Sequence, residues 1–155
     1  MTAIIYFCEI LIAPILAIIL LATTTLKVSE AVVLFSGGAV GWSLGEYGVH
    51  RFVLHNLAPK QHRIHHARSH KAIVRIFWQI WVCFAVVYLI AGGVFLAGTL
   101  VAYAWYLFVH HCAHHSPDTL PKSLLKHHNS HHQFARRNYG VSTTLWDHVF
   151  KTIIR

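Results

Sequence analysis

The chain has 155 residues, of which 55% are apolar and 12% are charged, and its mean hydropathy is +0.50. Soluble domains are roughly 45–50% apolar and about 25% charged, so this composition argues against a soluble domain and favours a membrane protein. The formal net charge of +8 favours anionic lipid headgroups or an acidic protein as partners, and no nucleic acid is expected. The three cysteines have no paired spacing, which argues against a disulfide framework.

Four apolar stretches follow one another along the chain, and we interpret them as two transmembrane hairpins. The predicted spans are 3–25, 31–50, 74–96 and 98–114. The last two are halves of one apolar block that is too long for a single span. Lys27 is expected in the turn of the first hairpin and Gly98 in the turn of the second. We expect residues 1–155 to form one domain.

The basic residues give the expected orientation. Of the 13 Lys and Arg residues, all but Lys27 lie within 51–75 or 122–155. Basic segments beside membrane spans stay on the cytoplasmic side, so segments 51–73 and 115–155 and both termini are expected there. The predicted fold is an all-α membrane protein with four transmembrane helices and a cytoplasmic helical cap that carries a histidine-rich site.

The polar segments contain histidines in a repeated arrangement. All 15 histidines lie between His50 and His148, in four groups at or beyond the ends of apolar spans. The ten candidate metal ligands in these groups are His50, His55, His62, His65, His66, His110, His114, His128, His131 and His132. Spacings of three and four residues place side chains on one helix face, and neutral imidazole is a good ligand for iron, zinc and copper. Ten imidazoles exceed the needs of one ion, so we predict two metal ions with about five ligands each.

Several alternatives stay open at this point. The spacing of five between His50 and His55 does not fit a straight α-helix, because five residues turn it by about 500°. The helix must bend or end there, or the two rings must serve different metals. In the third group, His111 and His115 form a shifted pair with the same spacing as the chosen one. A solvated histidine-rich surface, a structural zinc site and a haem-binding protein compete with the dinuclear interpretation, although structural zinc usually takes thiolates and haem takes single axial histidines.

Other polar residues near these groups are given supporting roles. Glu46 precedes His50 by one helical turn and is predicted to accept a ring N–H from it, which would fix the tautomer. Asp147 is predicted to act in the same way on a ligand or on the neighbouring histidine. Three further histidines are expected at the surface or behind the ligands: His70, His127 and His148.

The four groups and their flanks resemble the histidine boxes of the fatty acid hydroxylase / sterol desaturase superfamily. The matching segments are EYGVHRFVLH at 46–55, HRIHH at 62–66, H-x3-H at 110–114 with Ser116-Pro117 after it, HNSHH at 128–132, and NYGVSTTLWD at 138–147. They cover about residues 42–150, and within the superfamily they are most similar to fatty acid 2-hydroxylases. The resemblance implies a membrane-bound dinuclear iron oxygenase that uses O2 and an external source of electrons.

The function that we expect from this resemblance is hydroxylation of a C–H bond in a lipid, with a fatty acyl chain as substrate. Zinc can replace iron in such nitrogen sites in purified protein. The sequence shows no flavin, iron–sulfur or haem-binding motif and no fused cytochrome b5 domain, so a separate ferredoxin or cytochrome b5-like carrier is expected. The metal ligands form the expected catalytic centre, and no separate acid or base is assigned. A carotenoid or sterol hydroxylase or desaturase, and a non-catalytic histidine-rich metal carrier, are the alternatives.

Overall fold

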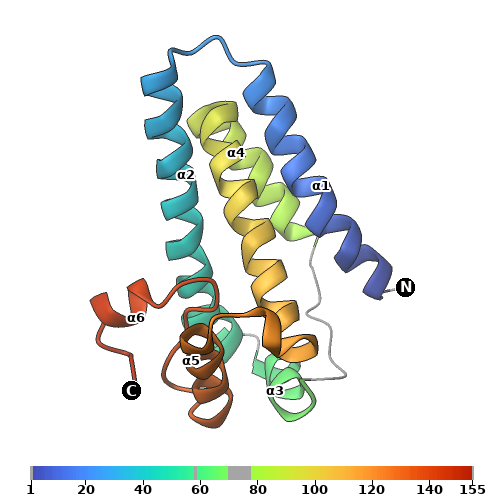
Figure 1. Cartoon of the computed structure of the whole chain (residues 1–155), viewed down its shortest axis with the longest axis vertical. Helices are drawn as coiled ribbons and strands as arrows, with labels where there is room; N and C mark the ends of the chain where they lie inside the picture. The colour runs from blue at the N-terminus through green and yellow to red at the C-terminus, as the bar shows by residue number, and fades with distance from the viewer. Residues whose placement is uncertain (1, 58, 70–77, 155) are drawn as a thin grey trace. The chain divides into compact units, whose positions relative to one another are not determined.

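The computed structural model describes residues 2–57, 59–69 and 78–154 (Figure 1). These residues form helices and no strand. The helices are α1 Thr2–Ala22, α2 Val28–Gly48, the π-helix η1 Val49–Leu57, α3 Pro59–Ala67, α4 Gln79–His115, the short 3-10 helix η2 Pro117–Thr119, α5 Lys122–Gln133 and α6 Leu145–Val149. The chain divides into two compact units, one of Met1–Trp42 with Val74–Trp105 and one of Ser43–Ile73 with Tyr106–Arg155.

Glycines allow close helix packing in the first unit. A Cβ added to Gly38 of α2 would lie 2.0 Å from the Phe95 carbonyl oxygen, and one added to Gly98 of α4 would lie 1.9 Å from the Phe35 carbonyl oxygen. No other residue type fits at such a distance. Thr99 adds a polar contact, since its hydroxyl donates to the Gly38 carbonyl at 3.3 Å. Small residues serve the same purpose at helix contacts in membranes.

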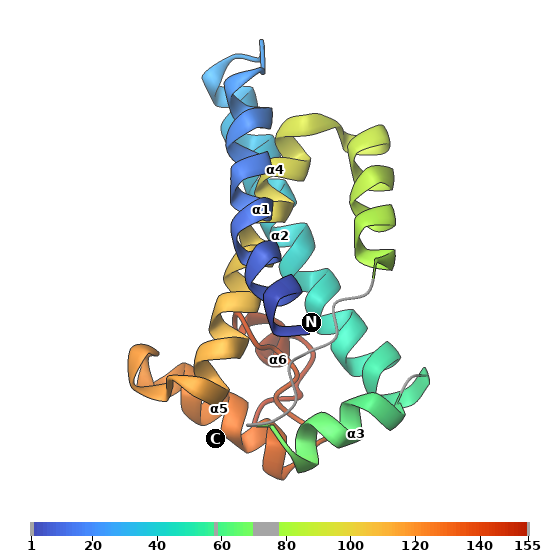
Figure 2. The same ribbon diagram turned by 90° about the vertical axis from the view of Figure 1, so that its right-hand side faces the viewer.

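Helix α4 folds back on itself within the predicted second hairpin, but its turn is not at Gly98. The chain reverses at Gly92, which has φ +81° and interrupts α4 (Figure 2). Glycine tolerates positive φ because it has no Cβ, whereas Gly98 lies within the helix and packs against α2. The arm of α4 before the turn rises about 20 Å at ~1.5 Å per residue, which is less than a hydrocarbon core of about 30 Å. The predicted start of this span, residues 74–77, lies outside the described residues.

Within the described parts of the chain, two helices are long and apolar enough to cross a membrane, the continuous stretch Val28–Leu57 and α4. Within α1, the segment Tyr6–Ala22 is apolar but shorter. Buried in α1, Glu9 accepts hydrogen bonds from Trp81 Nε1 at 3.2 Å and from the Tyr103 hydroxyl. These two partners lie on the two arms of α4, so the carboxylate ties α1 to both arms.

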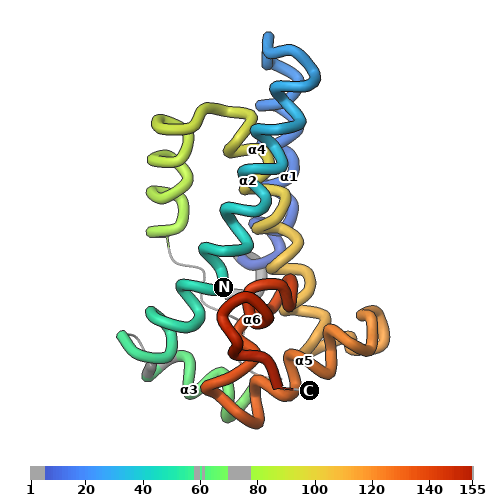
Figure 3. Tube along the Cα trace, turned by 90° about the vertical axis from the view of Figure 1, so that its left-hand side faces the viewer, coloured from blue at the N-terminus to red at the C-terminus, as the bar shows by residue number. Residues whose placement is uncertain are grey.

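The second unit is built from the end of α2, η1, α3, the end of α4, and α5 and α6. Its apolar core contains Val109, Cys112, Ala113, Leu120 and Val141. After α5 the chain turns back, and the segment that carries α6 lies beside α5 (Figure 3). All ten predicted metal ligands belong to this unit.

Candidate metal centre

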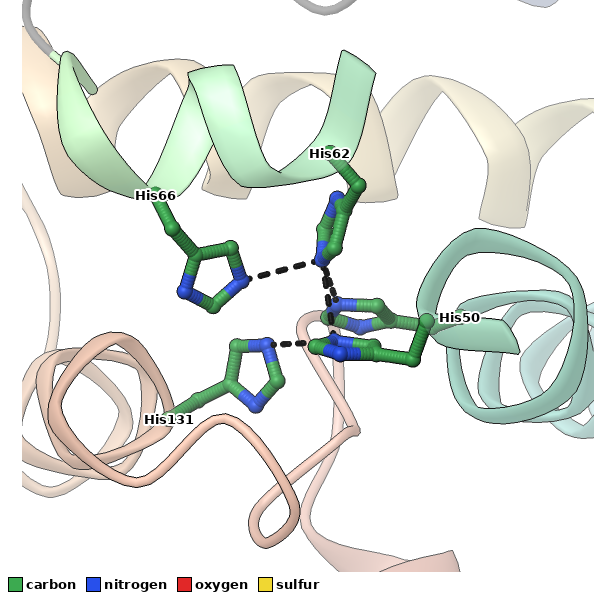
Figure 4. Close-up of side chains that lie close together, drawn as sticks. His50, His62, His66 and His131 are labelled. Atoms are coloured by element: carbon green, nitrogen blue, oxygen red, sulfur yellow. Dashed lines mark hydrogen bonds between the residues drawn. The ribbon is translucent and has the colours of Figure 1, made fainter. Parts of the chain in front are cut away.

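Five histidines from three helices converge in a first cluster. Its members are His50, His55, His62, His66 and His131. One ring nitrogen from each lies within 4.8 Å of the corresponding nitrogens of the others. Figure 4 shows the rings of His62 and His66 on α3, His50 on η1 and His131 on α5 directed at one small volume.

A second cluster of five histidines is built in the same way. Its members are His65, His110, His114, His128 and His132, again with ring nitrogens within 4.8 Å of one another. Four of these side chains are buried, whereas three of the five in the first cluster are only half-buried. The ten histidines predicted as ligands are therefore the ten that the structure brings together, five in each cluster.

Helices α3 and α5 each contribute to both clusters. On α3, His62 and His66 belong to the first cluster and His65 belongs to the second. On α5 the assignment is inverted, since the pair with a spacing of four joins the second cluster and His131 joins the first. A spacing of four aligns side chains more closely than a spacing of three. The two spacings therefore separate each helix's histidines between the two clusters.

The π-helix η1 accounts for the spacing of His50 and His55. A π-helix closes i→i+5 hydrogen bonds, so residues five apart return to one face. Both rings lie in the first cluster, with centroids 5.2 Å apart. The helix neither ends between them nor sends them to different clusters. It changes its winding instead, as π-helical turns often do at functional sites.

The distances between ring nitrogens fit a metal ion in each cluster. The Nε2 atom of His62 lies 3.0 Å from those of His50 and His55 and 2.9 Å from that of His66. One ring nitrogen has one hydrogen or one lone pair, so hydrogen bonding does not satisfy three such neighbours. A metal about 2.0–2.1 Å from each nitrogen would separate neighbouring nitrogens by about 2.9 Å at right angles and about 3.4 Å in a tetrahedron. Six Nε2 pairs, four in the first cluster and two in the second, lie 2.9–3.3 Å apart, and all candidate ligand atoms of a cluster lie within 4.8 Å of one another.

The surroundings keep the rings neutral, which is the state that binds metal. Burial is the largest cause that lowers the pKa of His62, to about 2, and neighbouring imidazoles lower it further. Burial likewise lowers the pKa of His131 and of His132 to about 3. The Arg137 carbonyl acts in the opposite direction on His131, because it accepts a hydrogen bond from the ring.

Backbone carbonyls orient two rings of the first cluster. The Nδ1 atom of His50 lies 2.5 Å from the Tyr139 carbonyl oxygen, and that of His131 lies 2.7 Å from the Arg137 carbonyl oxygen. A carbonyl only accepts, so each Nδ1 carries the hydrogen and each Nε2 presents its lone pair to the cluster. Both carbonyls belong to the segment 137–142 between α5 and α6, which we call the strap.

The structure corrects the expected partner of Glu46. Its buried carboxylate does not accept from His50, whose Nδ1 is bonded to the strap. It accepts from the backbone N–H groups of Val141 at 2.8 Å and Ser142 at 2.9 Å, and from the Ser142 hydroxyl. The reason is that the strap offers several N–H and O–H groups that would otherwise be buried without an acceptor.

Asp147 has a different partner from the predicted one as well. Its fully buried carboxylate accepts from the backbone N–H groups of Tyr139 at 2.8 Å and Gly140 at 2.7 Å, and from the Thr152 hydroxyl at 2.7 Å. Its ring partner is His127, at 3.0 Å, which is neither a cluster member nor His148. Burial alone would raise the pKa of Asp147, but these hydrogen bonds hold it below its ordinary value.

The structure also places the remaining histidines. In the third group, His111 and His115 stack on each other with centroids 4.7 Å apart and belong to neither cluster. His127 is buried and His148 is exposed. His70 lies outside the described residues.

No hydrogen-bonding role was predicted for the strap residues whose backbone forms these contacts. They are Arg137, Tyr139, Gly140, Val141 and Ser142. Four of them lie in the NYGVSTTLWD segment that was matched only as a signature. Their backbone atoms do the binding, so residue type alone gave little signal.

The comparisons with known proteins agree with the histidine pattern. The profile of the fatty acid hydroxylase family matches residues 35–152. Fatty acid 2-hydroxylases of Rattus norvegicus and Homo sapiens are 30% and 32% identical over 148 and 150 residues, which cover 78% and 77% of the chain. A dihydroceramide fatty acyl 2-hydroxylase of Arabidopsis thaliana is 29% identical over 141 residues and 75% of the chain.

The chain spans only part of these relatives. The matched regions cover 39% of the rat and human proteins and 58% of the Arabidopsis protein. No solved structure matches the chain.

Proposed function

Because the chain belongs to the fatty acid hydroxylase family, we propose that it is a membrane-bound oxygenase that hydroxylates a C–H bond of a lipid. The observation that carries the proposal is the pair of five-histidine clusters in one compact unit. Bound iron would supply the activation of O2, since all-nitrogen ligation suits iron or zinc and iron is the one with O2 chemistry. We propose one iron ion in each cluster.

In this proposal the ten clustered histidines hold the two ions as neutral ligands. These histidines would fix the position of each ion. Because imidazole is neutral and no carboxylate is among the ten, the positive charge of each ion would stay uncompensated. Four of the five side chains of the second cluster are buried, which excludes water from this cluster in particular. No other side chain is assigned as an acid or a base.

The proposed substrate is a fatty acyl chain, free or within a larger lipid. The relatives are named for hydroxylation at carbon 2 of a fatty acid or of the fatty acyl group of dihydroceramide, and on that likeness we propose carbon 2 here. A substrate from the bilayer suits the two long apolar helices. Carotenoid and sterol substrates are outcomes that the same experiment would detect.

We propose that the second unit faces the cytoplasm, with both termini on that side and four membrane-crossing segments in a single domain. The support is the distribution of charge, because 12 of the 13 Lys and Arg residues lie within 51–75 and 122–155. The turn between α1 and α2 carries the remaining one, Lys27.

Electrons are proposed to come from an acidic one-electron carrier, a ferredoxin or a cytochrome b5-like protein. Exposed basic side chains of the second unit include Lys126, Arg136 and Lys151. Such charges steer an acidic partner, and the steering weakens with salt because the screening length is about 10 Å at 0.1 M.

The charge proposal is tested by one matched pair of reversals. Arg136→Glu should slow reduction by the carrier several-fold at low salt and little at high salt, whereas Lys27→Glu should not. Arg137 is avoided because its guanidinium donates to the Lys151 carbonyl and its own carbonyl holds His131. Equal effects of the two reversals, or reduction that is indifferent to salt, would contradict steering by this surface.

The activity itself is tested by expressing the chain in cells fed with ¹⁸O2 and analysing their lipids by mass spectrometry. We expect hydroxylated acyl chains that carry one ¹⁸O atom and are absent when His128 is replaced by alanine. Elemental analysis of freshly purified protein should give about two metal ions per chain. Full metal content without any oxygenated lipid would favour a non-catalytic metal carrier instead.

A further inference from the structure

We infer that Glu46 and Asp147 are positioning residues for the first cluster alone, and that they act on it through the strap. The inference rests on the proposed dinuclear centre and deepens it, since it makes the two metal sites unequal. Neither carboxylate touches a ring of the ten clustered histidines in the hydrogen bonds that the described residues show. Asp147 also accepts from His127, which is not one of the ten, and from Thr152. The contact that the two carboxylates share is with the strap backbone, and we infer that their effect passes through it.

The two carboxylates hold successive backbone N–H groups of the strap. Asp147 takes those of residues 139 and 140, and Glu46 takes those of residues 141 and 142. Four consecutive peptide groups are thus fixed by two buried acceptors. The strap backbone is therefore constrained at four successive positions.

The strap also contacts the first cluster, through two of its carbonyl groups. The carbonyls of Arg137 and Tyr139 accept the Nδ1–H groups of His131 and His50. The peptide that joins Tyr139 to Gly140 supplies one carbonyl to His50 and one N–H to Asp147. If that peptide shifts, the hydrogen bond to His50 Nδ1 is disturbed. The Nε2 lone pair of His50 is then no longer held in one orientation.

The hydrogen bonds described for the strap do not include two rings of the second cluster, His110 and His128. His110 and His128 are buried, and among the described residues their Nδ1 atoms have no hydrogen-bond partner. The strap reaches the helix that carries His110 only by packing, since its Val141 lies in the apolar core with Val109 and Cys112. The orientation of the second cluster depends on the packing of α4 and α5 instead.

Gly140 gives an independent way to displace the strap without altering either carboxylate. A Cβ at this position would lie 2.1 Å from the Thr143 carbonyl oxygen and 3.0 Å from Asp147 Oδ2. The backbone must move to accept it, so Gly140→Ala should reproduce the effect of removing Asp147. Ser43→Ala is the matched control, because it removes a hydrogen bond of the same unit, from Trp146 Nε1 at 3.0 Å, away from the strap.

The experiment is a Zn²⁺ titration of the purified full chain in a chelator buffer, with bound zinc measured by elemental analysis. Outer partners of ligand histidines change metal affinity by about 10–100-fold. We expect Asp147→Asn, Glu46→Ala and Gly140→Ala to weaken one of two zinc ions by that factor, and Ser43→Ala to weaken neither.

The site of the weakened ion is found by combining Asp147→Asn with a variant of each cluster. Only the second-cluster ion should remain in His55→Ala, and Asp147→Asn should then change its affinity by less than about twofold. In His110→Ala only the first-cluster ion should remain, and the same change should weaken it by about 10–100-fold. Equal weakening in the two backgrounds, or the opposite pattern, would overturn the inference.

Failure of the dinuclear proposal looks different. Wild-type protein that binds a single zinc ion would refute two sites. The cluster that binds this ion would then decide the positioning role. The role is supported if His55→Ala removes the ion and Asp147→Asn lowers its affinity. The role is contradicted if only His110→Ala removes the ion. A melting temperature for each variant separates these effects from loss of the fold.

Discussion

The two histidine clusters have the same number of ligands and share two helices, yet they are organised differently. Two rings of the first cluster are held by hydrogen bonds, since the strap carbonyls fix His50 and His131. Two rings of the second cluster are held by packing, since His110 and His128 are buried and their Nδ1 atoms have no hydrogen-bond partner among the described residues.

The difference shows two physical ways to aim an imidazole. A hydrogen bond to Nδ1–H fixes both the tautomer and the ring plane, and it works at a half-buried site. Close packing restricts the ring by steric contact, but it leaves the tautomer to the metal itself. The first cluster is therefore expected to respond to changes in a distant loop, and the second to changes in the helices that carry it.

The largest expected effect comes from removing a single histidine of α5, either one that belongs to the first cluster or one that belongs to the second. We expect His131→Ala and His128→Ala each to reduce product formation by more than about 100-fold, beyond the 10–100-fold typical of an outer partner. Each variant should keep about one metal ion per chain, because each removes a ligand from only one cluster. Elemental analysis with activity measurements checks both points. If either variant lost both ions while keeping its melting temperature, the two clusters would not be independent sites.

An intermediate effect is expected from acid on the metal-free protein. In the folded state burial holds the pKa of His62 at about 2 and of His131 and His132 at about 3, against 6.5 for an ordinary histidine. Between these values the unfolded chain binds more protons than the folded chain. The free energy of unfolding is therefore greatest above about pH 6.5 and decreases as the pH falls toward 3.

Thermal melts of metal-free protein at a series of pH values test this. The melting temperature should fall from about pH 7.5 to about pH 5, and the fall should be shallower in the His131→Ala and His132→Ala variants, since each lacks one proton acceptor. A melting temperature that does not depend on pH would show that these rings are already protonated or exposed in the folded protein. If the melting temperatures of the two variants depended on pH with different slopes, the difference would show which cluster is more deeply buried.

The arrangement of the ligands was largely predictable from the sequence. Histidine spacing by three and four follows from helix geometry, and it accounts for eight of the ten residues that the structure gathers. The division into two clusters was not predictable at the level of residues, because it depends on how α3 and α5 are turned toward each other. The spacing of five between His50 and His55 signalled an irregular helix but did not identify a π-helix.

Two other differences have a shared cause. Gly92 and Gly98 lie in the same apolar block, and their composition does not tell which one adopts a positive φ and which one packs against Phe35. Glu46 and Asp147 bind backbone N–H groups, which nearly every residue possesses, so no side chain in the sequence marks the partner. In both cases the deciding contact involves a backbone atom.

The smallest expected effect distinguishes the two possible frames of the third histidine group. His114 is buried in the second cluster, whereas His115, the next residue, is exposed and stacks on His111. We expect His115→Ala to leave the metal content at about two ions per chain and to change stability by about 0.5–1.5 kcal/mol at most, which is the range for a lost ring pair. His114→Ala, one position earlier on the same helix, should lose one ion and the activity. Both variants remove the same side chain from adjacent positions, so a difference in metal content reports the ligand frame and not histidine content. If His115→Ala lost an ion and His114→Ala did not, α4 would present its other face to the metal, and the second cluster would have to be rebuilt around His111 and His115.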